Sequence, residues 1–403
     1  MSRLFLALAL LGAACSSVSA PDELALLEAT TSTSRWTSTV ASTTTTTLST
    51  TSVQTEPEPS ESTSEATAST PTTSPVGSQA DAPAGGGGAP VDVMALYAGV
   101  LGTYGVDQIL ATSPVGMPTV PTGVAPLTGL PSGRSATGAI VVKIDNSSKA
   151  RPQAGLDVAD VVIEQEVEGG LTRFAAIFQS AAPERIGPVR SARSTDISFL
   201  SALGQPGLAY SGANEVFDTL ILRQERVRNY SANRFGGYWR DSSRRAPSNL
   251  YTSMSQFSTN AVAPPAWFHF AGAPIVRGTA TSSFVAAFPA TSITWTWNGS
   301  VWQRAQDGRN HAAESGVALG ATNVVVAQVA VVDSGLKDPT RAVVPEFVWA
   351  GEGPVAVFTN GHRIDGRWIR PTLADPAVFV DANGEIIELT PGNTWVELTR
   401  SLP

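Results

Sequence analysis

The chain has 403 residues, 42% of them hydrophobic and 15% charged, with a formal net charge of -8. Residues 1–90 hold two basic and eight acidic side chains, which leaves 24 basic against 26 acidic in the rest. This nearly neutral remainder lacks the basic surface that nucleic-acid binding needs, and its length allows about two domains.

The N-terminus has the pattern of a bacterial lipoprotein signal. The apolar run LFLALALL at residues 4–11 follows Arg3 and is too short to span a membrane, but it fits the apolar core of a signal peptide. Cys15, the only cysteine, comes directly after Gly12, Ala13 and Ala14. We therefore expect a signal peptide at 1–14, lipidation at Cys15, and an extracytoplasmic protein anchored to the membrane by its lipid. The alternative is an ordinary secretory signal, which would release the protein.

Residues 15–90 have the composition of a disordered tether. Residues 31–80 contain 29 Ser or Thr, and residues 85–88 are four glycines. Such a tract has too little apolar surface to offset the entropy of ordering the chain. We expect it to act as a spacer between the membrane and the folded part.

The first predicted folded unit covers residues 126–264. The run AIVVKID at 139–145 predicts a buried strand, and the two alternating runs within 161–179, joined at Gly169-Gly170, predict a hairpin. Period-2 alternation assigns two faces. One face would hold Val161, Ile163, Val167, Phe174 and Phe178, and the other Glu164, Glu166, Glu168 and Arg173, with Glu166 directly opposite Arg173.

Three helices are predicted after this hairpin, over 194–203 with Ser194 or Thr195 as N-cap, 215–227 and 252–262. The second unit, 285–403, has strand-like runs such as NVVVAQVAVV and PVAVFT between turn signals. The expected fold class is α+β. A mixed α/β N-terminal domain would precede a mostly antiparallel β C-terminal domain, built as a sandwich or open barrel, after the disordered tether.

Several long motifs resemble one family of bacterial envelope proteins. They are PLTGLP (126–131), IDNSSKARPQAGLDVADVV (144–162), EGGLTRFAAIFQ (168–179), IGPVRSAR (186–193), YWRDSSRRAPSNLYTS (238–253) and ELTPGNTWVEL (388–398). Together they resemble the YerB-like lipoproteins, which have an N-terminal and a C-terminal domain of unknown function. The sequence departs from the family pattern at Ser248, where a histidine is common, and in AYSGANE (209–215). The resemblance implies the two-domain architecture and no established activity.

Metal and cofactor chemistry is not predicted. The three histidines, His269, His311 and His362, are far apart in the sequence and form no metal-ligand pattern. Nucleophile-elbow, phosphate-loop and dinucleotide motifs are absent from the sequence. We expect no cofactor and no metal.

Arginines and carboxylates of the first unit are the candidate site. Arginine suits bidentate recognition of carboxylate or phosphate, and the predicted helix at 194 offers a positive N-terminus beside Arg190 and Arg193. The candidate residues are Asp145, Glu164, Glu166, Arg173, Arg190, Arg193, Arg240, Asp241 and Arg244.

Three functions fit this pattern. The first is a module that binds an anionic cell-wall component or an envelope protein. The second is an enzyme that cleaves cell-wall glycan or peptide with Glu164 or Glu166 and Asp145, since glycosidases need two carboxyls at a defined separation. The third is a scaffold that docks a partner through its β unit.

Overall fold

The computed structural model of the chain describes residues 116–403, apart from 224–225, 274 and 339–340. The predicted signal peptide, Cys15, the tether and most of the segment before residue 126 lie outside the described residues. In the part that is described, no helix is long and apolar enough to cross a membrane.

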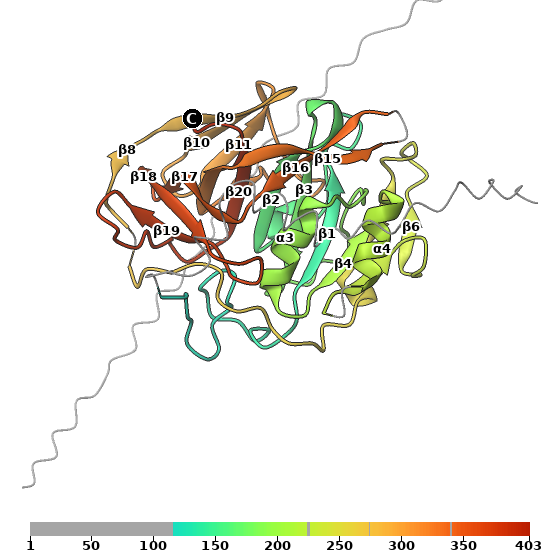
Figure 1. Cartoon of the computed structure of the whole chain (residues 1–403), viewed down its shortest axis with the longest axis horizontal. Coiled ribbons are helices and arrows are strands. Elements are labelled where there is room, and N and C mark those ends of the chain that lie inside the picture. Colours follow the sequence, from blue (N-terminus) through green and yellow to red (C-terminus); the bar gives the residue numbers. More distant parts are fainter. Residues whose placement is uncertain (1–115, 224–225, 274, 339–340) are drawn as a thin grey trace, which may run out of the picture. The chain divides into compact units, whose positions relative to one another are not determined.

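A mixed sheet of 11 strands runs through the middle of the described part (Figure 1). Its order is β19 (Val378–Asp381), β18 (His362–Arg370), β17 (Gly351–Thr359), β14 (Asn323–Gln328), β20 (Thr394–Thr399), β2 (Val161–Glu166), β3 (Thr172–Phe178), β1 (Ile140–Asp145), β4 (Gly207–Tyr210) and β5 (Arg228–Ser231), with β8 (Thr279–Ala280) beside β18. Strands from both predicted units therefore belong to one sheet.

The last strand, β20, joins the two halves of the chain. It pairs in parallel with both β14 and β2, so that Val396 lies between Val325 and Ile163. The mostly antiparallel pairing predicted for the C-terminal strands is confirmed. The predicted sandwich or open barrel is wrong, because strands of the second unit continue the sheet of the first. Parallel partners need no local turn between them, and local sequence gives no sign of such pairing.

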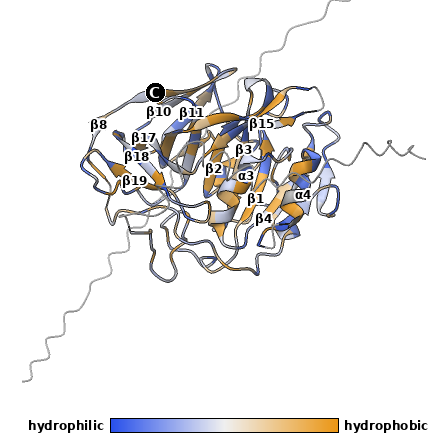
Figure 2. Ribbon diagram, in the orientation of Figure 1, coloured by the Kyte–Doolittle hydropathy of each residue, from blue (hydrophilic) through white to orange (hydrophobic). Residues whose placement is uncertain are grey.

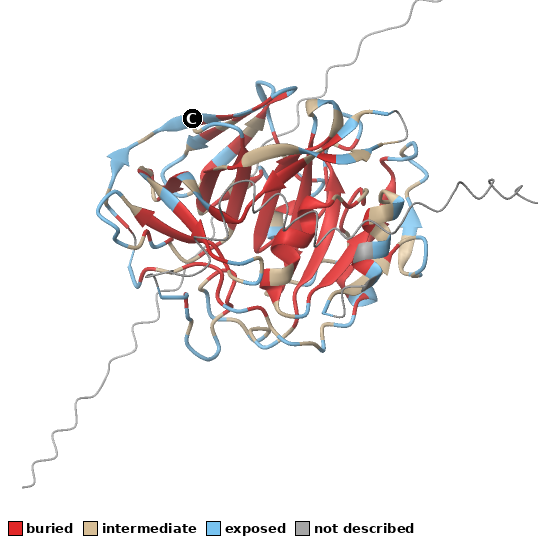
Figure 3. Cartoon of the chain, in the orientation of Figure 1, coloured by how far each residue is buried: buried red, intermediate tan, exposed pale blue. Residues whose placement is uncertain are grey.

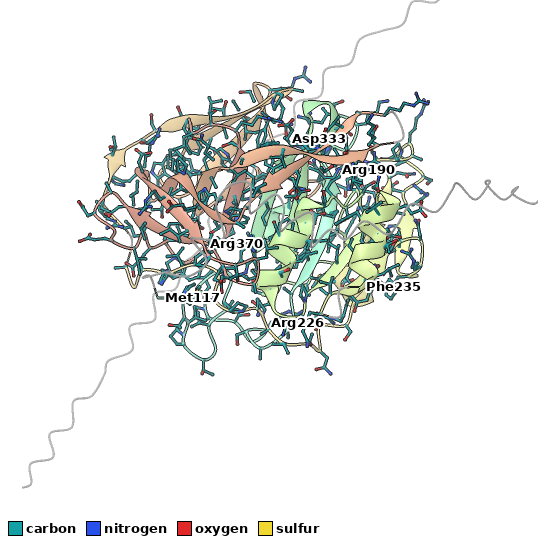
Figure 4. All side chains as sticks on the ribbon, viewed as in Figure 1. Met117, Arg190, Arg226, Phe235, Asp333 and Arg370 are labelled. Carbon is teal, nitrogen blue, oxygen red and sulfur yellow. The ribbon has the colours of Figure 1, made fainter. Side chains whose placement is uncertain are left out.

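Two layers cover the sheet. One face carries α3 (Thr195–Leu200), η3 (Ser201–Leu203), α4 (Glu215–Arg223) and the hairpin of β15 (Ala330–Lys337) and β16 (Val343–Val348). The other face carries a small sheet of β9 (Ser283–Phe288), β10 (Thr291–Trp297), β11 (Trp302–Gln306), β12 (Arg309–Asn310) and β13 (Gly320–Ala321). The strands in the middle of the large sheet are consequently apolar (Figure 2) and buried (Figure 3).

The remaining elements are β6 (Tyr238–Arg240), β7 (Leu250–Thr252), η1 (Leu156–Val158), η2 (Glu168–Gly170) and η4 (Met254–Gln256). The helix predicted over 252–262 is wrong, since its first residue ends β7 and only η4 follows. The amide of Thr252 donates to Ile186 O, which fixes an extended backbone there. The helix predicted over 194–203 is confirmed as α3 and η3, and α4 confirms the start of the helix at 215. Overall the described part is mostly β.

Candidate functional site

Three arginines meet where β1 ends. Arg173 on β3 pairs across the sheet with Asp145, the last residue of β1. Arg190 follows in the segment before α3, where its amide donates to Lys143 O, and its Nε lies 3.4 Å from Asp145 Oδ2. Arg193 Nη2 lies 2.6 Å from Glu168 Oε2. We call Arg173, Arg190 and Arg193 the arginine site.

Asp145 is held in place by hydroxyl groups. The Ser147 amide donates to its Oδ1, and the side chains of Ser147 and Ser248 donate to Oδ2. Ser248, where the sequence departs from the family pattern, thus contacts a carboxylate of the arginine site. Because hydroxyls and Arg190 share Asp145, this carboxylate does not fully balance the charge of Arg173.

Arg173 carries the least compensated charge of the arginine site. It is only 7% exposed, and its one hydrogen bond is a long one, 3.4 Å from Nη1 to Ser191 O. Burial lowers its pKa to about 9, with the positive charge of Arg193 as the next cause, and Arg190 also lowers it. Since this pKa still lies above neutral pH, Arg173 keeps its charge without full compensation.

The arginine site also has unused donors. Among the described residues, the Nε atoms of Arg173 and Arg193 are buried without a hydrogen-bond partner, and the buried Nε of Arg190 has only its 3.4 Å contact with Asp145 Oδ2. A buried donor without a partner costs about 1–3 kcal/mol, so such groups require an explanation. The Nε atoms of Arg151, Arg228 and Arg304 are in the same state elsewhere, so the feature that favours an acceptor here is the grouping of three arginines with two such donors.

A buried ion pair next to the arginine site holds the backbone of Arg193 in place. Lys143 Nζ lies 2.6 Å from Asp196 Oδ1, and both side chains are fully buried. Asp196 Oδ2 also accepts the amide of Arg193, and Oδ1 accepts Gln165 Nε2. Burial lowers the pKa of Lys143, and the charges of Arg173 and Arg193 add to this effect. Four cations therefore face three carboxylates, Asp145, Glu168 and Asp196, around the site.

The predicted helix N-terminus does not contribute a free anion site. Helix α3 has six residues, and its first turn is already bonded, because Asp196 N donates to Arg193 O and Ile197 N to Ser194 O. The Thr195 side chain accepts the amide of Phe347 from β16. This part of the sequence interpretation is wrong, since the amides of Asp196 and Ile197 already donate to carbonyl groups of the same turn.

A cavity of about 460 Å³ opens beside the arginine site. Its walls come from the segment before α3, the start of α4 and the β15–β16 hairpin, and include Glu168, Ser191, Arg193, Glu215, Lys337 and Asp338. The hairpin is fastened at two points. Asn214 Nδ2 donates to Lys337 O at 3.2 Å, and Ser194 donates to Glu346. Residues of both predicted domains thus enclose one cavity.

The faces predicted for the hairpin are wrong. Glu166 pairs with Thr172, and Gln165 with Arg173, one residue away from the predicted register. The connection from Val167 to Leu171 is closed by the bond from Val167 N to Leu171 O, so it is longer than two residues. A slip of one residue reverses every side chain. Ile163 and Phe174 consequently lie in different cores, and both faces of the hairpin are buried.

Glu164 and Glu166 do not reach the arginine site. Glu164 is fully buried on the opposite face, where its Oε2 lies 2.7 Å from Arg304 Nη2, and Arg304 is also fully buried. The Oε1 of Glu164 accepts Thr172 Oγ1 and Asn146 Nδ2. Glu166 is bonded twice by Arg400, at 2.8 and 3.1 Å.

The network around Glu164 contains residues that sequence reasoning did not identify. Glu397 on β20 is fully buried, and its pKa is raised well above the usual value by burial and by the neighbouring charge of Glu164. Arg304 also contacts His311, whose Nε2 lies 2.7 Å from Gln153 Oε1. Burial, followed by the charge of Arg304, lowers the pKa of His311 to about 2. His311 is therefore neutral, although it lines a cavity of about 650 Å³.

Arg240, Asp241 and Arg244 have local structural partners. Arg240 Nη1 donates to Asn249 Oδ1 at 2.7 Å, and Asp241 pairs with Arg185. Arg244 donates to the backbone oxygens of Ala150 and Pro152. They therefore hold loops together, and the structure does not bring them to the arginine site. Among the described residues, no group of three His, Cys, Asp or Glu side chains is placed to hold a metal ion.

Two protein-family models match the chain. The model for "Protein of unknown function (DUF3048) N-terminal domain" matches residues 127–264, and the model for the C-terminal domain matches residues 284–396. The chain belongs to this family. The resemblance to YerB-like proteins is confirmed by "Putative lipoprotein YerB" of Bacillus subtilis (strain 168), 37% identical over 134 residues. That match covers 32% of this chain and 40% of the relative, less than half of its length.

A solved structure has the same fold. The crystal structure of YerB protein from Bacillus subtilis matches with a TM-score of 0.59 and 24% sequence identity. The match covers 69% of this chain and 97% of that chain. The shared fold therefore includes most of the described part, with strands of both family domains.

Proposed function

We propose that this protein is a lipid-anchored, extracytoplasmic binding protein, and that its arginine site holds an anionic group of a cell-wall component or envelope protein. The observation that carries the proposal is the grouping of Arg173, Arg190 and Arg193 around Asp145, in which the buried Nε atoms of Arg173 and Arg193 have no partner among the described residues. Guanidinium groups match the geometry of carboxylate and phosphate oxygens, so an anion supplies the acceptors that the folded chain lacks.

The location follows from the leader and from a relative. The apolar run at 4–11 and the single Cys15 have the pattern of a lipoprotein signal, and the similar Bacillus subtilis protein is called a lipoprotein in its name. A Ser/Thr-rich tether between lipid and domain would let the arginine site search the envelope near the membrane.

Geometry favours binding over cleavage. The enzyme hypothesis pairs Asp145 with Glu164 or Glu166, but Asp145 and Glu164 lie on opposite faces of the sheet. Glu164 is fully buried in its pair with Arg304, and Glu166 is paired with Arg400. A carboxyl that acts on a substrate must come within hydrogen-bond reach of it. Full burial of Glu164 and the pairing of Glu166 with Arg400 do not favour that.

Retention on isolated cell wall tests the proposal. We would incubate the secreted Cys15→Ala chain with purified wall, measure bound protein, and measure released muropeptide in the supernatant. Arg190→Gln should lower retention, whereas Arg367→Gln, which alters an exposed pair with Glu352, should not. Equal retention of both variants would contradict binding at the arginine site, and muropeptide release would support the enzyme hypothesis instead.

A further inference from the structure

The cavity beside the arginine site has charges of both signs on its walls. Arg193 and Lys337 are its cations, and Glu168, Glu215 and Asp338 are its carboxylates. Arg173 lies behind the wall, where it donates to Ser191 O. Glu168 is paired with Arg193 and Asp338 accepts the amide of Ala342, so Glu215 is the wall carboxylate that would repel a purely anionic ligand, whereas a ligand with both charges is matched.

Glu215 is available to a ligand. It is exposed in the first turn of α4, and within the described part of the chain its carboxylate makes no hydrogen bond or ion pair. The helix does not need this carboxylate as a cap, because Asn214 Oδ1 already accepts the amide of Val216 at 3.0 Å. Its charge is therefore free to pair with a cation in the cavity.

Glu168 provides a second acceptor. Its side chain is 9% exposed, and only Oε2 is bonded, to Arg193. Its Oε1 is buried and has no partner, as is the Nε of Arg193. The Arg193–Glu168 pair thus keeps one unused donor and one unused acceptor at the cavity wall.

We infer that the cavity takes a zwitterionic ligand, a short peptide or amino acid with a free amine and a free carboxylate. The carboxylate binds at Arg193, in the field of Arg173 and Arg190, and the amine binds at Glu215 and Glu168. A volume of about 460 Å³ lies in the range of small-ligand sites. This inference rests on the proposed function, because it requires the arginine site to bind an anion.

The hairpin of the C-terminal domain completes the site. Lys337 and Asp338 line the cavity at the end of β15, and Asn214 holds that end through Lys337 O. Residues of both family domains therefore line the proposed ligand site.

Three probes of nearly equal size separate the two charges. Dialanine carries both, N-acetyl-dialanine only the carboxylate, and dialanine amide only the amine. Binding to the secreted Cys15→Ala chain is measured by calorimetry. Dialanine should bind at least about tenfold more tightly than either blocked probe, because a charge-assisted hydrogen bond contributes about 1.5–3 kcal/mol.

Variants assign each end of the ligand. Glu215→Gln should weaken dialanine about tenfold and leave N-acetyl-dialanine unchanged. Arg193→Gln should weaken both, with the urea midpoint measured to verify folding, and Arg193→Lys should restore part of the affinity. Glu388→Gln, an exposed residue outside the cavity wall, is the matched control and should change nothing.

The outcomes distinguish the two proposals. If N-acetyl-dialanine binds as tightly as dialanine, the zwitterion inference is overturned and anion binding stands. If neither N-acetyl-dialanine nor inorganic phosphate binds, the proposed function itself fails. Equal binding of dialanine amide and dialanine would mean that the cavity recognises only a cation, which overturns both.

Discussion

Replacing Arg173 with methionine should stabilise the ligand-free protein while it weakens anion binding. A pKa near 9 in place of 12.5 means that the charged side chain costs the folded state on the order of 5 kcal/mol, since one pKa unit corresponds to about 1.4 kcal/mol. Methionine fills similar space without charge. It loses one long hydrogen bond to Ser191 O, worth about 1 kcal/mol, and some packing. We expect a net gain of about 1–3 kcal/mol, in line with other replacements of buried ions.

Arg304→Met is the matched control. Arg304 is equally buried, but its charge is paired with Glu164 at 2.7 Å, and its guanidinium lies 5.3 Å from the ring of Phe174 and 5.1 Å from that of Trp395. Its removal would leave the carboxylate of Glu164 next to Glu397 without a cation. Breaking a buried pair in this way costs about 3–5 kcal/mol. The same substitution should therefore have opposite effects on the two faces of the sheet.

Urea unfolding at neutral pH, followed by tryptophan fluorescence, measures both effects. The midpoint should rise for Arg173→Met and fall for Arg304→Met, and unchanged slopes would show that the unfolded states are comparable. Saturating phosphate or N-acetyl-dialanine should raise the melting temperature of the wild type, since a ligand at a hundred times its Kd adds about 2.7 kcal/mol. The same concentration of ligand should raise the melting temperature of Arg173→Met by less. A loss of about 3 kcal/mol or more for Arg173→Met would refute the reasoning, because Arg173 would then be a structural ion-pair partner.

Three further predictions concern other parts of the chain. Glu397→Gln should flatten the pH dependence of stability. The folded state keeps the Glu397 proton that the unfolded chain releases above about pH 4.5, so the wild type loses stability as pH rises from there. Urea titrations at about pH 5 and 8 give the unfolding free energy of both proteins. An equal change of this free energy between the two pH values in the wild type and in Glu397→Gln would contradict the prediction. Asp196→Asn should cost about 3–5 kcal/mol in the same assay by leaving Lys143 buried without its partner, and a loss under about 1 kcal/mol would show that Lys143 is neutral. Cys15→Ala should move the protein from the membrane fraction to the medium, as fractionation would report, whereas continued membrane retention would exclude the lipid anchor.

The hydrophobic pattern by itself determined several of the strands, including β1, β2, β3, β14 and β17, and the first helix. Runs such as 139–145 and 323–332 are rich in Val and Ile and lie in strands, and the start of the helix near Thr195 was also predicted. Arg173, Arg190 and Arg193 were identified as candidates from residue type, because guanidinium groups have a strong preference for anions. Local sequence sufficed for these features, since strand and helix formation depend on neighbouring residues.

Tertiary structure alone decided which face each side chain occupies and which charges meet. The hairpin strands are covered on both faces, so alternation of Glu164 and Ile163 did not separate core from solvent. Glu164 is buried because Arg304, 140 residues later, supplies a cation that no local pattern reveals. The β15–β16 hairpin lines the cavity near Lys337, the last residue of β15. It can do so because β20 brings the second half of the chain into the sheet of the first. Burial of a charge depends on a partner in space, and the sequence around the charge does not contain that partner.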